Sequence, residues 1–423
     1  MATESLERNI VIVGGGIIGC TTAYFLTRHP SFNPTKYTIT ILEAQSIASG
    51  ASGQAGGLLA LWAYPSSIVP LSYKLHAELA KEHDGAKRWG YRTLHCGSLS
   101  AKGKDYSGET NSNTNTNTAG NKDGPGAAEE WQKLPKTNNK GVSKNGVPSS
   151  LDWFDPDCIK AYSEMGTPST TAQVHPYQFT TSMASLAVSS GAKIILGSAT
   201  SIDYAGPSGV KSVTYEDKET KDIHTLPATD VVLAAGPWTS QVFPEAPIEA
   251  VRAHSVVVEA DVSPYAVFSE ISLPKTFGGD ADAEGKKRHG SVVSPEMYAR
   301  PDGTVYACGE ADTLAPLPPS TALVQCSPSH ITSLISYISS ISPALRHGKI
   351  LAEQACYLPS VTGPGTSGPL IGETGIRGLY MATGHTCWGI QNSCATGKLM
   401  SEFLFEGGAK SARVEALDPR RFL

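Results

Sequence analysis

Three glycines near the N-terminus have the spacing of a site for a nucleotide pyrophosphate. Gly14, Gly16 and Gly19 follow the apolar run "NIVIV" and open a stretch with the composition of a helix. In a strand–turn–helix unit, the first glycine permits a tight turn, the second lets a phosphate approach the backbone, and the third lets the helix pack on the strand. The helix N-terminus then faces the phosphates with N–H groups and its positive dipole end. The spacing predicts a dinucleotide site, and a glycine-rich turn that only packs is the alternative.

A carboxylate at the end of the next strand supports this prediction. Glu43 ends the run "YTITILE" and lies 24 residues beyond Gly19, where an acid accepts hydrogen bonds from a ribose 2′-hydroxyl. The same charge disfavours a 2′-phosphate. The sequence therefore favours NAD or FAD over NADP.

Three later stretches favour FAD over NAD. "SGASGQAGG" (49–57) is built of small residues that leave room for a diphosphate and a ring system, and its serines can donate to phosphate oxygens. "VVLAAGPWT" (231–239) ends a predicted strand in a tight turn. "ATGHTCWGIQNSCATGK" (382–398) opens a helix near Gly389, and that helix N-terminus can stabilise negative charge on a reduced flavin ring.

The elements that must position these residues alternate between strands and helices. Residues 9–13 and 37–44 are predicted as parallel strands of a βαβ unit. Residues 251–260 and 296–310 alternate as antiparallel strands of a separate sheet. The stretch 327–345 is predicted as one helix. The predicted fold class is α/β, with a Rossmann-like FAD-binding domain and an antiparallel-sheet substrate domain.

This pattern predicts two interleaved domains. We expect a discontinuous FAD-binding domain and a substrate or lid domain. The first is assigned residues 1–92, 166–248 and 346–423, and the second 93–165 and 249–345. Residues 103–149 are polar and of low complexity, and are interpreted as a flexible insertion in the lid.

Composition excludes several other classes of protein. The chain of 423 residues carries a net charge of −5 with no clustered basic run, which argues against nucleic-acid binding. Its 8 cysteines are scattered without a CxxC pair, so neither a metal site nor a disulfide framework is expected. We also expect no membrane span, and a cytoplasmic location, because no signal peptide precedes the glycine motif and the terminal "RFL" is not a convincing peroxisomal signal.

Taken with the tail "ALDPRRFL", these stretches resemble the superfamily of D-amino-acid oxidase, glycine oxidase and sarcosine oxidase, and in particular its fungal FAD-dependent members. The resemblance covers essentially the whole chain except 103–149. It implies that a hydride passes from a carbon next to nitrogen to flavin N5, and that water hydrolyses the resulting imine. It also implies a small amine or amino-acid-like substrate, with O₂ or another electron acceptor.

The resemblance also assigns residues to the cofactor. The predicted FAD contacts are Gly14, Gly16, Ile17, Ile18, Glu43, Ala44, Ser49, Ser52, Ala55, Gly56, Gly57, Leu58, Ala199, Ala235, Gly236, Trp238, Cys356, Gly384, His385, Gly389 and Ile390. Relatives of the sarcosine-oxidase branch attach the flavin to a cysteine at the position of Cys356. A covalent FAD through Cys356 is therefore one prediction, with Cys387 as a rival and non-covalent FAD as the alternative.

The substrate site departs from the resemblance at three positions, one of which is the apolar stretch "LLALWAYP" (58–65) where sarcosine-oxidase relatives carry basic residues. Amino-acid oxidases of the superfamily hold the substrate carboxylate with an arginine where this chain has Leu358, which leaves Arg300 as the best anion clamp and Arg252 and Arg92 behind it. The lysine that assists O₂ reduction in relatives corresponds to Ala307. An acceptor other than O₂ is therefore an alternative.

The remaining predicted site residues are aromatic or titratable. His385 and Tyr298 join Arg300 as the predicted catalytic residues, with packing roles as the alternative. Trp62, Tyr298 and Trp388 are predicted to wall an aromatic pocket that suits a planar or cationic amine.

The predicted function is FAD-dependent oxidation of a secondary amine or an amino-acid-like substrate, by an enzyme that acts on CH–NH or CH–NH₂ groups. An FAD-bearing protein with a binding or trafficking role remains an alternative, with the polar insertion as its recruiting element. An NAD dehydrogenase, which would be colourless when purified, is the third hypothesis. The oligomeric state is not predicted.

Overall fold

The structure is a computed structural model that describes residues 8–106, 146–206, 209–277, 291–363 and 368–423. Its helices are α1 (Ile17–Thr27), α2 (Ala51–Gln54), α3 (Val69–Glu82), α4 (Gly85–Trp89), α5 (Pro176–Ser189), α6 (Thr239–Val242), α7 (Pro328–Ser339), α8 (Pro343–His347) and α9 (Gly389–Glu406). Its strands are β1 (Arg8–Val13), β2 (Tyr37–Glu43), β3 (Leu58–Ala60), β4 (Arg92–Thr93), β5 (His95–Lys102), β6 (Ile159–Gly166), β7 (Thr171–Gln173), β8 (Lys193–Tyr204), β9 (Val210–Asp217), β10 (Ile223–Pro227), β11 (Asp230–Leu233), β12 (Ile248–Glu259), β13 (Tyr265–Ser272), β14 (Val292–Val293), β15 (Glu296–Ala299), β16 (Thr304–Asp312), β17 (Ile350–Val361), β18 (Leu370–Glu373) and β19 (Leu379–Thr383).

The first sheet has the order β10-β9-β8-β2-β1-β11-β19-β18 and is parallel from β8 to β19. In β1, Ile10 and Ile12 face the core formed with α1, α5 and α9, while Val11 and Val13 face the opposite core. The chain leaves β1 toward β2 on one side and later adds β11 on the other. Ligands of open α/β sheets bind at such a switch point, outside the carboxyl ends of the strands.

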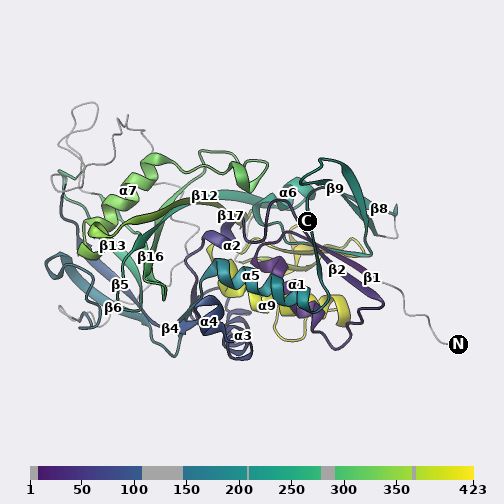
Figure 1. Cartoon of the computed structure of the whole chain (residues 1–423), viewed down its shortest axis with the longest axis horizontal. Helices are drawn as coiled ribbons and strands as arrows, with labels where there is room; N and C mark the ends of the chain where they lie inside the picture. Colours follow the sequence, from purple (N-terminus) through teal and green to yellow (C-terminus); the bar gives the residue numbers. More distant parts are fainter. Residues whose placement is uncertain (1–7, 107–145, 207–208, 278–290, 364–367) are drawn as a thin grey trace.

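The second sheet has the order β17-β12-β16-β15-β13-β5-β6 and is antiparallel except where β13 meets β5. Helix α7 packs its apolar side on one face, where Val256 and Val258 lie. Val257, Tyr298 and Tyr306 lie on the other face, together with Leu58 that follows α2. Figure 1 shows the two sheets side by side, with β1, β2, β8 and β9 at one end, β5, β6 and β13 at the other, and α2 between them. The short third sheet, β3-β7-β4, completes the fold.

The structure confirms the predicted fold class and corrects one helix. The single helix predicted over 327–345 is divided into α7 and α8. Pro343 lacks the N–H that a continuous helix would need, and the Ser342 side chain accepts a hydrogen bond from the Leu345 N–H to begin α8.

The domain boundaries stay a prediction. Strand β17, which they assign to the FAD-binding domain, pairs with β12 in the antiparallel sheet. Most of the predicted insertion 103–149 lies outside the described residues. Within the part of the chain that the structure describes, no helix has the length and apolarity to cross a bilayer.

Candidate active site

A cleft with about 1150 Å³ of empty space opens at the carboxyl ends of β1, β2 and β11, and is called the first cleft. It lies at the switch point of the first sheet. The predicted FAD contacts that line it are Gly14, Gly16, Ile17, Ile18, Glu43, Ala44, Ser49, Ser52, Ala199, Ala235, Gly236, Trp238, His385 and Gly389. Segments far apart in the sequence therefore meet at this one edge of the sheet.

The glycine turn leaves no room for side chains. Gly14 has a φ of +113°, and a Cβ there would lie 2.4 Å from the Ala234 carbonyl oxygen. A Cβ on Gly19 would lie 2.0 Å from the Gly14 carbonyl oxygen. The first glycine thus permits the turn and the third permits contact between helix and turn, as the sequence predicts.

The N-terminus of α1 points into this cleft, its N-cap residue Gly16 has no side chain, and its first turn holds no acidic residue. The Ile17 N–H donates to the Ser52 Oγ over 2.9 Å, so Ser52 retains its own proton for an acceptor in the cleft. An uncapped helix N-terminus lined by glycine backbone suits a pyrophosphate. This cradle fits the diphosphate of FAD.

Glu43 is fixed before any ligand arrives. Its carboxylate accepts hydrogen bonds from the Gly15 N–H over 2.7 Å and the Gln45 N–H over 2.8 Å. The Ser49 hydroxyl approaches to 3.4 Å. Two carboxylate oxygens offer about four acceptor sites, so lone pairs remain for ribose hydroxyls. Glu43 therefore fits the ribose of an adenine dinucleotide.

Replacing Glu43 with glutamine is expected to weaken FAD binding about tenfold, because hydrogen bonds to a charged acceptor contribute about 1.5–3 kcal/mol each. The dissociation constant can be measured by flavin fluorescence after removal and re-addition of FAD. Glu219→Gln, at an exposed turn position, is the matched control. An unchanged dissociation constant in Glu43→Gln would contradict the assigned role.

The loop 313–327, which joins β16 to α7, closes over the first cleft and is called the strap. Its residues Pro319, Ser320 and Thr321 line the cleft. The Trp238 indole N–H donates to the Pro318 carbonyl over 2.7 Å, and the Thr321 hydroxyl donates to the Ser49 Oγ over 3.0 Å. The strap therefore attaches the second sheet to the cofactor side of the first.

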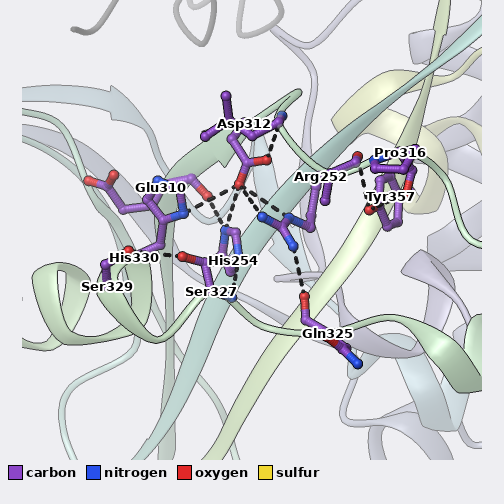
Figure 2. A network of polar contacts seen from close by, with 12 residues as sticks. Arg252, His254, Glu310, Asp312, Pro316, Gln325, Ser327, Ser329, His330 and Tyr357 are labelled. Atoms are coloured by element: carbon purple, nitrogen blue, oxygen red, sulfur yellow. Dashed lines mark hydrogen bonds and ion pairs between the residues drawn. The ribbon is translucent and has the colours of Figure 1, made fainter. Parts of the chain in front are cut away.

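A buried charge network, the Asp312 cluster, anchors the strap (Figure 2). The Asp312 Oδ2 accepts from the Arg252 Nε over 3.2 Å and from its Nη2 over 3.0 Å. The remaining Arg252 Nη1 donates to the Gln325 carbonyl in the strap over 3.1 Å. Although burial opposes it, the Arg252 hydrogen bonds lower the pKa of Asp312. This ion pair thus joins the two ends of the strap.

The same cluster contains His254 and His330. One ring nitrogen of each histidine and one carboxylate oxygen of Asp312 lie within 4.8 Å of one another, as the ligands of a metal ion would. The His254 Nε2 accepts the Ser327 N–H over 3.0 Å, so its Nδ1 carries the proton that it donates to the Glu310 carbonyl over 3.1 Å. Neither nitrogen of His254 offers a lone pair to a metal. The Arg252 guanidinium supplies the cation for Asp312, so the geometry argues against a metal ion here.

A second cleft, with about 980 Å³ of empty space, continues from the first between α2, the second sheet and the start of α9. Ile17, Ser52 and Gly389 line both clefts. The predicted residues that line the second alone are Ala55, Gly56, Gly57, Leu58, Tyr298, Cys356, Cys387, Trp388 and Ile390. A long slot of this kind fits a dinucleotide with a flavin ring at one end and room for a substrate beyond it.

A carboxyl group and a phenol form a buried pair in the second cleft. Glu296 and Tyr298 project from the same face of β15, and the Tyr298 hydroxyl donates to the Glu296 Oε2. Burial raises the pKa of Glu296 to about 7 and raises the pKa of Tyr298. A Cβ on Gly56 would lie 2.2 Å from the Tyr298 ring, so glycine at that position admits the ring.

His385 lines only the first cleft. The Thr396 hydroxyl donates to the Asn392 carbonyl over 3.0 Å, so the contact of 2.9 Å between the His385 Nε2 and the Thr396 Oγ1 requires a proton on that nitrogen. Burial lowers the pKa of His385 to about 3. The imidazole is therefore neutral and offers an acceptor at Nδ1, and the catalytic role of His385 stays a prediction.

Arg300 does not line either cleft. Its Nη2 donates to the Ala55 carbonyl over 3.0 Å, and its guanidinium lies 5.1 Å from the centre of the Tyr306 ring. Arg92 donates to Gln173 and Ala299. The prediction of Arg300 as an anion clamp is not supported, because its hydrogen bond holds the loop behind the cleft wall.

Three other predicted positions also lie outside the clefts. Gly384 turns the chain after β19, with a φ of +79°. Ala307 belongs to the core under α7, because side chains alternate along β16 and its neighbours Tyr306 and Cys308 take the cleft side. Trp62 packs edge-on behind the cleft residue Trp388, with ring centres 5.5 Å apart.

Cys356 lines the second cleft from β17, as do Cys308 and Cys387 from other elements. Burial raises the pKa of Cys356 and of Cys387 to about 12, and burial also raises that of Cys308. All three are thus protonated thiols at neutral pH, and the thiolate is the nucleophile in cysteine chemistry. The covalent tether stays a proposal with three candidate sulfurs.

Acid precipitation of the purified yellow protein is expected to release the flavin into the supernatant, because a protonated thiol is a poor nucleophile. The absorbance of supernatant and pellet measures this directly. Flavin retained on the polypeptide, and lost from Cys356→Ala but not from Cys387→Ala, would instead establish the tether.

Sequence reasoning missed one carboxyl group of the second cleft, that of Glu296. Alternation offered a signal, since Glu296 lies two residues before the predicted Tyr298. The strap gave no signal, because its loop residues reach the first cleft only through tertiary contacts.

Comparisons with known proteins agree with this geometry. The signature of the DAO family, described as "FAD dependent oxidoreductase", matches residues 9–403. The chain is 37% identical to "Putative oxidoreductase TDA3" of Saccharomyces cerevisiae, over 98% of this chain and 95% of that protein. Its fold is similar to glycine oxidase from Bacillus cereus (20% identity, 95% of each chain, TM-score 0.66) and to L-proline dehydrogenase from P. horikoshii (18% identity, 99% and 98% of the chains, TM-score 0.67). The chain belongs to the DAO family of FAD-dependent oxidoreductases.

Proposed function

We propose that this oxidoreductase oxidises a C–N bond of a small amine or amino-acid-like molecule and passes the electrons to O₂. The observation that carries the proposal is the buried Glu296–Tyr298 pair in a cleft that is continuous with the cofactor cleft. The similarity to glycine oxidase and to L-proline dehydrogenase supports the fold but not the substrate. When bound, FAD supplies a hydride acceptor at N5 of its ring.

The Glu296 carboxylate is suited to take a proton from the substrate ammonium. A base that acts near neutral pH needs a pKa near 7, and burial raises the pKa of Glu296 to about that value. Loss of this proton frees the nitrogen lone pair. The hydrogen on the neighbouring carbon can then leave as hydride while the lone pair forms the C=N bond of an imine. Water then hydrolyses the imine to an amine and a carbonyl compound.

The surrounding side chains orient this base and exclude water. The Tyr298 hydroxyl donates to Glu296 and holds one carboxyl oxygen in place. Phe268 and Trp388 supply apolar surface in the same cleft. A water-poor cleft strengthens the hydrogen bond between the pair, because the local dielectric constant is low.

An anaerobic screen tests the proposed function. The yellow holoprotein is mixed with a panel of amines and amino acids without oxygen, and loss of flavin absorbance reports reduction. Air is then admitted to identify the electron acceptor. Rapid return of the flavin absorbance supports O₂, and slow return supports another acceptor. Failure of every amine and amino acid to bleach the flavin would contradict the proposal.

A further inference from the structure

Arg300 holds a buried positive charge directly behind the wall of the second cleft. The residue follows β15 and is 8% exposed. Its Nη2 donates to the Ala55 carbonyl over 3.0 Å, and its guanidinium lies 5.1 Å from the centre of the Tyr306 ring. Ala55 and Tyr306 both line the second cleft. The charge is therefore separated from the space of the cleft by one layer of residues.

This charge has no ionic partner. The Arg300 Nε is buried without a hydrogen-bond acceptor, and among the described residues no acid forms an ion pair with the guanidinium. Burial lowers the pKa of Arg300, but a guanidinium stays protonated in proteins. Arg252, by contrast, is paired with Asp312. A buried charge without a partner opposes folding, so an apolar side chain of similar volume at position 300 would suit the fold better.

The neighbouring groups leave a net positive charge at this place. The Arg92 Nη2 donates to the Ala299 carbonyl, one residue before Arg300, and within the described structure Arg92 also has no acidic partner. The charge of Asp302 acts on both arginines, but its side chain is 43% exposed and is screened by solvent. Burial lowers the pKa of His175, which lies 3.9 Å from Asp302, so this imidazole is neutral. Two guanidinium groups thus face one screened carboxylate.

The carboxyl group of the second cleft lies too far along the strand to compensate Arg300. Glu296 precedes Arg300 by four residues, which corresponds to about 13 Å in a strand. Tyr298 lies between them in the sequence, and its hydroxyl donates to Glu296. The field of Arg300 therefore reaches the second cleft without a counter-charge beside the guanidinium.

We propose that Arg300 raises the reduction potential of FAD bound in the two clefts, through the wall formed by Ala55 and Tyr306. Transfer of a hydride to the neutral oxidised ring adds one negative charge to the ring unless a proton follows. A fixed positive charge in a water-poor site stabilises this negative charge and needs no rearrangement as it develops. Arg300 acts at a distance and is not a catalytic residue, since it lines neither cleft. The inference depends on bound FAD and not on the proposed substrate.

Anaerobic titration of the holoprotein against a reference dye of known potential tests this inference. Arg300→Met is expected to lower the equilibrium constant for two-electron reduction of the flavin about tenfold, which corresponds to a fall of about 30 mV in the midpoint potential. Arg300→Lys retains the charge and should stay within about threefold of the wild-type constant. Arg413→Met, at an exposed position, is the control. An unchanged potential in flavin-replete Arg300→Met, or an equal fall in Arg300→Lys, would overturn the inference.

A change of opposite sign separates the effect of charge from that of structure. Asp302→Asn removes the neighbouring carboxylate, while its amide oxygen can still accept from the Thr304 N–H and hydroxyl, so we expect the midpoint potential to rise. A structural disturbance near the cleft would not raise the potential in one variant and lower it in the other. The dissociation constant of FAD, measured by flavin fluorescence, reports any loss of cofactor separately. If Arg300→Met does not fold, the absence of a rise in Asp302→Asn would still overturn the inference.

Discussion

Replacement of Glu296 with glutamine is expected to slow anaerobic reduction of the bound flavin about 100-fold, because general-base catalysis contributes about 10²–10⁴-fold. The amide retains the size of the side chain and the contact with Tyr298, but it cannot take the substrate proton. Stopped-flow absorbance with an amine from the screen measures the rate constant. Glu270→Gln, an exposed glutamate of β13, is the control. A rate constant within threefold of the wild-type value would contradict the role of Glu296.

The dependence on pH provides an independent signature of the same group. Below pH 7 the raised pKa keeps Glu296 protonated and unable to accept a proton, so the wild-type rate constant should rise with pH through an apparent pKa near 7. This rise should be absent from Glu296→Gln. The Tyr298 hydrogen bond lowers the pKa of Glu296, so Tyr298→Phe should shift the rise to higher pH. A structural role alone would not move this midpoint.

The second large effect is expected at the Asp312 cluster. Asp312→Ala removes the partner of a buried Arg252, and removal of one member of a buried ion pair costs about 3–5 kcal/mol. The side chains of Asp312 and Arg252 are only 6% and 11% exposed, which places the pair in that class. We therefore expect a lower midpoint of thermal unfolding and faster loss of FAD, since the strap loses its anchor.

Unfolding curves and flavin fluorescence measure these two effects. Asp261→Ala, at an exposed position, is the control, and Arg252→Ala should resemble Asp312→Ala. The double variant should lose less free energy of unfolding than the two single variants lose in sum, because the residues share one interaction. A loss below about 1 kcal/mol, the value typical of exposed pairs, would contradict the assigned anchoring role.

Acid should weaken the same anchor. Burial lowers the pKa of His254 from 6.5 to about 4, so its stabilising contribution is complete above pH 6.5 and is lost as the pH falls toward 4. The lowered pKa of Asp312 acts in the same direction, since its contribution is lost as the pH falls below the ordinary value of 3.8. FAD should therefore dissociate faster between pH 6.5 and 4 than above that range.

The cofactor end of the site could be predicted from the sequence because its signals are local. The glycine turn depends on backbone conformation within a few residues. The position of Glu43 can be predicted because the residue ends a strand that its own alternation reveals. Such features appear in the order and type of neighbouring residues. The first cleft accordingly contains most of the predicted FAD contacts, and the second cleft contains all of the others except Gly384.

The substrate end could not be predicted to the same degree, because it depends on pairing between strands and on side-chain direction. Arg300 was expected in the cleft on account of its charge, but its guanidinium turns behind the wall to the Ala55 carbonyl. Ala307 lies on the face of β16 that packs under α7, because neighbouring residues of a strand point to opposite faces. The register of β16 against β12 shifts between Cys308 and Glu310, and no local pattern shows this shift.

The strap also determines how long a cofactor molecule stays with its polypeptide. It spans from one sheet to the other and is closed by Trp238 and Thr321 at the middle and by Arg252 at its end. Release of FAD from the first cleft should therefore require these contacts to open, so that the opening rate of the strap limits how fast the cofactor leaves.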